Sequence, residues 1–133
     1  MGSDRLYDDY GHRHWMSKQG VSVVGTQAAI AALTATKERI PYAAKCTAIS
    51  LVQTTGGTGA QSLVARKSLA GTGTLTAFGS YTLGTNADLA GGAFTMVATD
   101  FAAGDQLDIA IAEGTAGRTD VINFSIAFEE LPN

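Results

Sequence analysis

Large apolar residues alternate with polar or small residues in the last third of the chain, between Ala102 and Glu129. Alternation with a period of two is typical of a strand that buries one of its two faces. The glycine-containing segment 114–117 between the two alternating runs allows the positive φ angles of a tight reversal. The pattern therefore predicts a hairpin that anchors a β-sandwich. Its buried faces are expected to comprise Leu107, Ile109, Ile111, Ile122, Phe124, Ile126 and Phe128.

Shorter apolar segments, separated by glycine, threonine and asparagine, precede this hairpin, and none has a convincing helical period. Further strands are expected at 21–24, 27–36, 45–53, 62–69, 75–78, 80–83 and 94–99. The alanines of segment 27–36 also suit a helical turn, and that alternative stays open. Residues 37–39 are expected to form a charged turn, Pro41 to lie at an extended or edge position, and Phe101 to point inward. The prediction is an all-β, antiparallel, jelly-roll-like sandwich of about eight strands with an extended N-terminal arm.

The expected strand at 45–53 differs from the others because it is apolar on both faces. Strict alternation places Cys46, Ala48 and Val52 on one face, and Ile49 and Leu51 on the other. A strand that is apolar on both sides is covered on both sides. In a two-layer sandwich the second cover has to come from outside the pair of sheets, for instance from a neighbouring subunit.

The first twenty residues differ in composition from the rest of the chain, because they contain both histidines, the only tryptophan and many of the charges. We expect an arm at 1–20 and a sandwich domain at 21–133. The arm carries aromatic and apolar residues of the kinds enriched in buried interface anchors, so it is expected to dock on another protein or subunit. The alternative is that it folds back on its own domain. The candidate partner-binding residues are Leu6, Tyr7, Tyr10, His12, Arg13, His14, Trp15 and Met16.

Composition limits the possible functions. The 133 residues suffice for one domain with a single core. Only 16% of them are charged, which leaves little charge to keep a free monomer soluble and favours a surface covered by a partner or by copies of the chain. A net charge of −3 with scattered basic residues argues against nucleic-acid binding. No apolar run is long enough to span a membrane, and no signal peptide is recognisable, so synthesis in the cytoplasm of the producing cell is expected.

Residues that could carry catalysis or bind a cofactor have simpler structural interpretations. His12 and His14 would share one side of an extended segment, but without a second ligand cluster they predict no metal site. Cys46 lies within an apolar strand, where a thiol is usually inert. Asp105 suits a turn, and Asp108 is expected at a solvent-facing position of its strand. The carboxylate pairs Asp105/Asp108 and Glu113/Asp120 have no sign of a shared cleft. No enzymatic activity, cofactor or metal is therefore expected.

The glycine loops and the aromatic residues also have simple structural interpretations. Segments 56–59 and 71–73 lack the residues that complete a phosphate-binding loop, and turn glycines explain them. A sugar-binding surface would need an exposed aromatic platform. Tyr42, Phe78 and Tyr81 are the candidates, and burial in the sandwich explains each of them equally well.

Three segments together resemble the small jelly-roll modules of tailed-phage virion proteins, which include capsid decoration proteins, head-fibre modules and some fibre or baseplate domains. They are IPYAAKCTAISLVQ, FAAGDQLDIAIAEGTAG and VINFSIAFEE, with a glycine- and threonine-rich stretch after the first. The resemblance spans about residues 40–131 and concerns turns and alternation rather than a catalytic signature. It implies a location on the virion surface and a homotrimer.

These observations lead to one expected function and two alternatives. The chain is expected to be a structural protein that decorates and cements a phage capsid, through its arm on the major capsid protein and through self-association. One alternative is a fibre or baseplate module that binds a host receptor or glycan. The other is a small sugar-binding domain.

Overall fold

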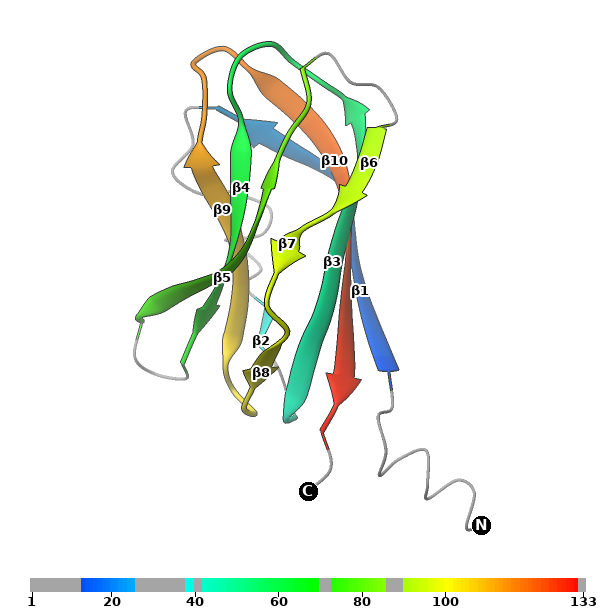
Figure 1. Cartoon of the computed structure of the whole chain (residues 1–133), viewed down its shortest axis with the longest axis vertical. Coiled ribbons are helices and arrows are strands. Elements are labelled where there is room, and N and C mark those ends of the chain that lie inside the picture. Colours follow the sequence, from blue (N-terminus) through cyan, green and yellow to red (C-terminus); the bar gives the residue numbers. More distant parts are fainter. Residues whose placement is uncertain (1–12, 26–37, 40–41, 70–72, 86–89, 132–133) are drawn as a thin grey trace.

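The computed structural model describes residues 13–25, 38–39, 42–69, 73–85 and 90–131, and these form two packed antiparallel sheets. Sheet A has the strand order β1-β10-β3-β6, with β8 also paired to β3, and sheet B has the order β2-β9-β4-β5-β7 (Figure 1). The all-β sandwich predicted from the sequence is confirmed. The strands are β1 (Arg13–Val24), β2 (Glu38–Arg39), β3 (Ala44–Thr55), β4 (Ser62–Ser68), β5 (Leu75–Thr82), β6 (Ala90–Ala93), β7 (Thr95–Met96), β8 (Thr99–Phe101), β9 (Gln106–Glu113) and β10 (Thr119–Glu130).

The two strands of the predicted hairpin exist, but they do not pair with each other. β9 pairs with β4 and β2 in sheet B, whereas β10 pairs with β1 and β3 in sheet A. The segment between them crosses from one layer to the other, so their apolar faces meet across the core. Of the two glycines that flank this segment, only Gly117 has a positive φ, of 84°. Gly114 is needed for space, because a Cβ there would overlap the carbonyl oxygen of Gly25.

The core lies between the sheets and is built mainly from aliphatic and aromatic side chains of β3, β4, β9 and β10. Phe101, expected to point inward, is 1% exposed and meets Phe78 and Phe128 edge to face, at 5.7 and 5.8 Å between ring centroids. Such contacts add to the free energy gained by burying the rings. The fully buried large apolar side chains are Phe101, Phe124, Ile49, Leu63, Ile109, Ile122, Ile126 and Val23.

Bulges in β3 overturn the predicted assignment of its faces. Ala48 pairs with Ala127 and Cys46 with Phe128, so Thr47 is an extra residue in β3. An extra residue reverses the alternation of side chains that follows it. Cys46 therefore shares the buried face with Ile49, although strict alternation separated them. Val52 stays on the opposite face and is 40% exposed.

In place of one strand at 94–99, the segment from Ala90 to Phe101 contains three short strands that alternate between the sheets. β6 pairs with β3 in sheet A, β7 pairs with β5 in sheet B, and β8 again pairs with β3. This segment therefore crosses twice between the two sheets along one side of the sandwich (Figure 1). Phe94 lies at the first crossing, where its amide donates to the carbonyl of Ile49 at 2.8 Å. Its ring stacks on Tyr81. Alternating apolar residues cannot reveal a segment that changes sheets every few residues.

Two further predictions about strands differ from the structure. The two strands expected at 75–78 and 80–83 are the single strand β5, in which Phe78 is the extra residue of a bulge opposite β4. The charged turn at 37–39 is replaced, at Glu38 and Arg39, by the short strand β2 on the edge of β9. The strand predicted at 27–36 and the position of Pro41 lie outside the described residues.

The expected boundary between arm and sandwich also changes. β1 begins at Arg13, and its backbone pairs with β10 from Arg13↔Glu129 to Val24↔Thr119. Residues 13–20 are thus a strand of the sandwich rather than a separate arm, while residues 1–12 lie outside the described residues. Met16, predicted as a partner contact, is partly buried and packs against the core.

A buried ion pair fastens the loops at one end of both sheets. The guanidinium of Arg118 donates to both carboxylate oxygens of Asp120 at 2.9 Å, and neither side chain is exposed. Arg118 also donates to the carbonyl oxygens of Gly59 and Gly84, which belong to two other loops. Asp120 in turn accepts from the Gln53 amide at 3.2 Å. Two buried charges are tolerated here because their hydrogen bonds are nearly all made within the chain.

We expect the variants Arg118→Met and Asp120→Asn each to lose about 3–5 kcal/mol of unfolding free energy, because the remaining partner stays buried without its counterion. Urea denaturation followed by circular dichroism measures this. Lys45→Ala is the control, since Lys45 and Asp100 form an exposed pair at 3.7 Å, and its removal should cost less than about 1 kcal/mol. Equal losses in all three variants would contradict the importance of the buried pair.

Cys46 gives a second prediction. Burial raises the pKa of its thiol from the ordinary value of 9.0 to about 12, against a smaller opposing effect of a backbone hydrogen bond involving Ala48. Since the thiolate is the reactive form, the native protein should not react with an aromatic disulfide reagent at pH 8, whereas the unfolded chain should. Between about pH 9 and 12 only the unfolded chain loses this proton, so the contribution of Cys46 to stability falls as pH rises. Rapid labelling of the native protein would contradict this burial.

Candidate functional site

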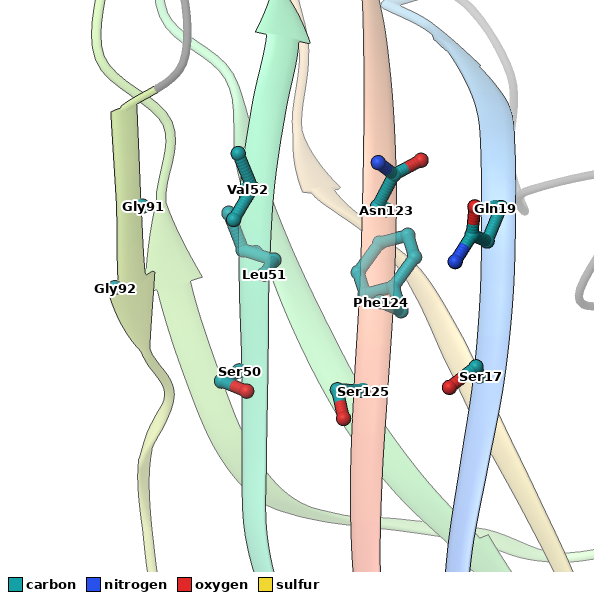
Figure 2. A pocket seen from close by; sticks show the side chains of 10 residues that line it. All are labelled: Ser17, Gln19, Ser50, Leu51, Val52, Gly91, Gly92, Asn123, Phe124 and Ser125. Carbon is teal, nitrogen blue, oxygen red and sulfur yellow. The ribbon is translucent and has the colours of Figure 1, made fainter.

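The outer face of sheet A is the most distinctive surface of the described structure. Ser17, Ser125 and Ser50 lie side by side on β1, β10 and β3, because Ser17 pairs with Ser125 and Ser125 with Ser50. Figure 2 shows this row of hydroxyl groups on the outer side of the three strands. Ser50 pairs in turn with Ala93 of β6, so small side chains continue across a fourth strand.

A second row runs parallel to the serines and contains Gln19, Asn123 and Val52 (Figure 2). Asn123 pairs with Val52, and Val52 pairs with Gly91 of β6. On the other side, the Asn123 side-chain oxygen accepts the backbone amide of Gly20 at 2.8 Å. Gly20 has a φ of 62°, and the pairing of β1 with β10 shifts at this point, so Asn123 fixes a bulge in the edge strand.

These rows line a shallow hollow that we call the neutral face, because none of its lining residues is charged. Its floor is formed at Leu51 and Phe124, whose side chains are buried in the core below. One wall is low, since it consists of Gly91 and Gly92. The lining residues are Ser17, Gln19, Ser50, Leu51, Val52, Gly91, Gly92, Asn123, Phe124 and Ser125.

The chemistry of the neutral face suits packing rather than catalysis. Hydroxyl and amide groups can donate and accept hydrogen bonds, but a serine nucleophile needs an adjacent base, and the lining residues include no histidine, lysine or carboxylate. Uncharged and partly apolar surfaces lose less free energy on desolvation than charged surfaces do, so they pack more readily against another protein. The exposed Val52 is the apolar centre of this surface.

The sequence pointed only indirectly to this surface. It predicted that one apolar face of β3 points away from the other sheet and is covered from outside the sandwich. Val52 does lie on that outer face. The rows from β1 and β10 were missed, because pairing between distant strands brings Ser17, Ser125 and Ser50 together. The available signal was the lack of charge at all outward positions of the central part of β10, which are Val121, Asn123, Ser125 and Ala127.

The predicted docking residues have different positions. Leu6, Tyr7, Tyr10 and His12 lie outside the described residues. Arg13, His14 and Trp15 form the start of β1, where their backbones pair with Glu129, Phe128 and Ala127. Their docking role, unlike their place in the sheet, stays a prediction.

The candidate carboxylates are engaged in contacts within the chain. Asp108, expected to face solvent, is 1% exposed and accepts from Arg66 of the neighbouring strand at 2.5 Å. Asp105 closes its turn as predicted, since its carboxylate accepts the amide of Ala102 at 2.9 Å. Asp120 belongs to the buried pair with Arg118, and Glu113 is exposed. The pairs Asp105/Asp108 and Glu113/Asp120 therefore do not face each other across a cleft.

The aromatic candidates for a sugar platform serve the core instead. Tyr81 stacks on Phe94 with 5.9 Å between ring centroids, and Phe78 meets Phe101. Tyr42 also packs against the core, and the pKa of its phenol is raised, first by burial and then by the nearby Glu130 carboxylate. Partly buried rings of this kind offer little of the flat exposed surface that a sugar ring stacks on.

The described residues offer neither a cluster of metal ligands nor a membrane-spanning helix. They contain no group of three or more histidine, cysteine or acidic side chains placed to hold a metal ion. They also contain no helix with the length and hydrophobicity of a membrane span.

Comparison with known proteins identifies the fold. No protein-family model and no curated protein matches the sequence. Among solved structures, Eiger TNF from S. frugiperda is 12% identical with a TM-score of 0.54, and the match covers 91% of this chain and 94% of that one. The sandwich is a jelly roll. This agreement confirms the predicted fold and, at such low identity, concerns the fold alone.

Two other solved structures are similar at lower scores. A cyanophage Pam1 capsid chain is 15% identical with a TM-score of 0.47, and the match covers 92% of this chain and 87% of that one. The CBM22-GH10 modules of xylanase 10B from Clostridium thermocellum are 11% identical with a TM-score of 0.46, and the match covers 96% of this chain but 27% of that one.

Proposed function

We propose that the protein is a structural component of a phage virion, which decorates and stabilises the capsid as a homotrimer. The observation that carries the proposal is the neutral face, a four-strand surface built for contact rather than chemistry. It fits the low charge of the chain and the resemblance of residues 40–131 to tailed-phage jelly-roll modules. Binding energy spread over many copies would resist the outward pressure of packaged DNA.

Self-association uses the neutral face in this proposal. Its small side chains allow close approach of another subunit, and burial of Val52 removes an exposed apolar group from water. The N-terminal segment supplies the second contact, with the major capsid protein. Because residues 13–24 belong to β1, this contact is assigned in the proposal to residues 1–12, with Leu6, Tyr7 and Tyr10 as its anchors.

Placing a charge on the neutral face should separate the subunits. We expect Val52→Asp to convert an oligomer into a monomer in sedimentation velocity, because a carboxylate would be desolvated in the interface. Unfolding free energy should change by less than about 1 kcal/mol, since the side chain faces outward. Thr58→Asp, on an exposed loop, is the control and should stay oligomeric. A wild-type chain that sediments as a stable monomer would contradict the proposed self-association.

The arm is tested by deletion of residues 2–12, which leaves β1 intact. The shortened chain should fold and assemble as before but fail to bind expanded capsids in a co-sedimentation assay. Deletion to residue 18 is unsuitable, because it removes half of a strand that pairs with β10. If the shortened chain binds capsids as well as the full chain does, the docking role of the arm is wrong.

Copy number separates decoration from the alternative of a fibre or baseplate module. A decoration protein should be present in hundreds of copies on the head. A few copies confined to the tail, together with binding to host cells or surface glycans, would favour the alternative.

A further inference from the structure

The edges of the two sheets differ greatly in length. Within the described ranges, three of the four edges consist of short strands: β2 and β7 have two residues each, and β6 and β8, which share one edge, have four and three. The fourth edge is β1, which has 12 residues and, in the part of the chain that the structure describes, pairs with β10 alone. A long edge strand presents a row of backbone N–H and C=O groups on which a strand of another molecule can form. This edge is therefore the one that most needs protection.

A bulge interrupts this edge near its middle. The pairing of β1 with β10 shifts by one residue between Lys18 and Val21, so that Gln19 and Gly20 together lie opposite Asn123. Gly20 has a φ of 62°, and its amide donates to the Asn123 side-chain oxygen at 2.8 Å. A Cβ added at Gly20 would meet nothing within 4 Å, so glycine is needed there for its φ and not for space. Because a bulge bends its strand and increases the local twist, a straight strand cannot pair along the whole of β1.

Lys18, directly before the bulge, lies on the inner side of β1. It pairs with Phe124, whose side chain is 2% exposed in the core, and paired residues point to the same side of a sheet. Figure 2 agrees with this, because the flanking Ser17 and Gln19 point outward. Lys18 is partly exposed at the open edge. A strand added to β1 would cover it and would take its ammonium group out of water, at a cost in free energy.

We propose that Lys18 and the Gly20 bulge keep the free edge of β1 from pairing with β1 of another copy. Inward-pointing charges and bulges are two of the means by which natural sheets avoid edge-to-edge growth. Here both occur within three residues on the one long edge of the described structure, and each contributes to the protection. The inference goes beyond the proposed function and does not rest on it, because it holds equally for a monomer and for an oligomer formed through the neutral face.

A double variant that combines Lys18→Val with deletion of Gly20 removes both features from the full chain. The deletion leaves Gln19 alone opposite Asn123, so β1 becomes regular and its other side chains keep their sides of the sheet. We expect the folded variant to form species that grow with time in sedimentation velocity, while the wild-type chain keeps a constant size. In the grown species, backbone amides of residues 13–24 should exchange hydrogen more slowly than in the wild-type chain, because the free edge of β1 has become paired.

Lys45→Val is the matched control. The Lys45 side chain is 42% exposed, but its strand β3 is paired on both sides at this point, with β10 and with β8. The control loses the same charge and gains the same apolar group as Lys18→Val, so it should keep the wild-type size. Growth of the control as fast as that of the double variant would overturn the inference, because the change in side chain would then act without a free edge.

Two results with the double variant would contradict the inference. One is a folded variant, checked by circular dichroism, that keeps the wild-type size, and the other is growth without slower exchange in residues 13–24. If the deletion prevents folding, Lys18→Val alone decides, because it keeps the bulge and changes one partly exposed side chain. Growth of this single variant with slower exchange in β1 supports the inference, and a constant size overturns it.

Discussion

The buried pair of Arg118 and Asp120 is the interaction on which the arrangement of the two sheets depends. It lies where the chain passes from β9 in sheet B to β10 in sheet A. Arg118 fixes the loops that contain Gly59 and Gly84, and its carbonyl accepts the amide of Gly25 at the end of β1. Arg118 thus holds three segments that are distant from it in sequence, two through its guanidinium and one through its backbone carbonyl. A hydrophobic pair could fill the same volume, but it would not specify which loop carbonyls meet there.

Fixing the start of β10 in this way determines both faces of sheet A. β10 is an inner strand of that sheet, and its inward side chains, such as Ile122 and Ile126, complete the core. The alternating positions Asn123 and Ser125 then have to face outward and form the centre of the neutral face. The bulges of β3 keep this register, because the hydroxyls of Thr47 and Thr54 donate to the carbonyls of Ala127 and Val121 where the pairing shifts. The neutral face is therefore a consequence of how the core is closed.

These long-range relations also set the limit of prediction from the sequence. The existence of β3, β4, β9 and β10 could be predicted, because each carries its own run of alternating apolar residues. Their distribution over two sheets could not, since a glycine-containing connection fits either a hairpin or a crossing. Asp108 appeared to face solvent because a charged residue between apolar neighbours usually does, and its partner Arg66 comes from another strand. Of the neutral face, only the apolar outer side of β3 could be predicted. Its three serines come together because β1, β10 and β3 pair with one another, and no spacing within the sequence reveals this.

The segment between Ala90 and Phe101, which crosses between the two sheets, both closes one side of the core and exposes an apolar residue to solvent. Its aromatic residues, Phe94 and Phe101, point inward and close the open side of the core. Between them the chain must cross from sheet A to sheet B and back, and Val97 lies at the turning point. Because this turn lies on the outside of the sandwich, the side chain of Val97 is in water unless another molecule covers it. An apolar residue at this position contributes nothing to the core, so its exposure fits the proposed self-association, in which another copy would cover it.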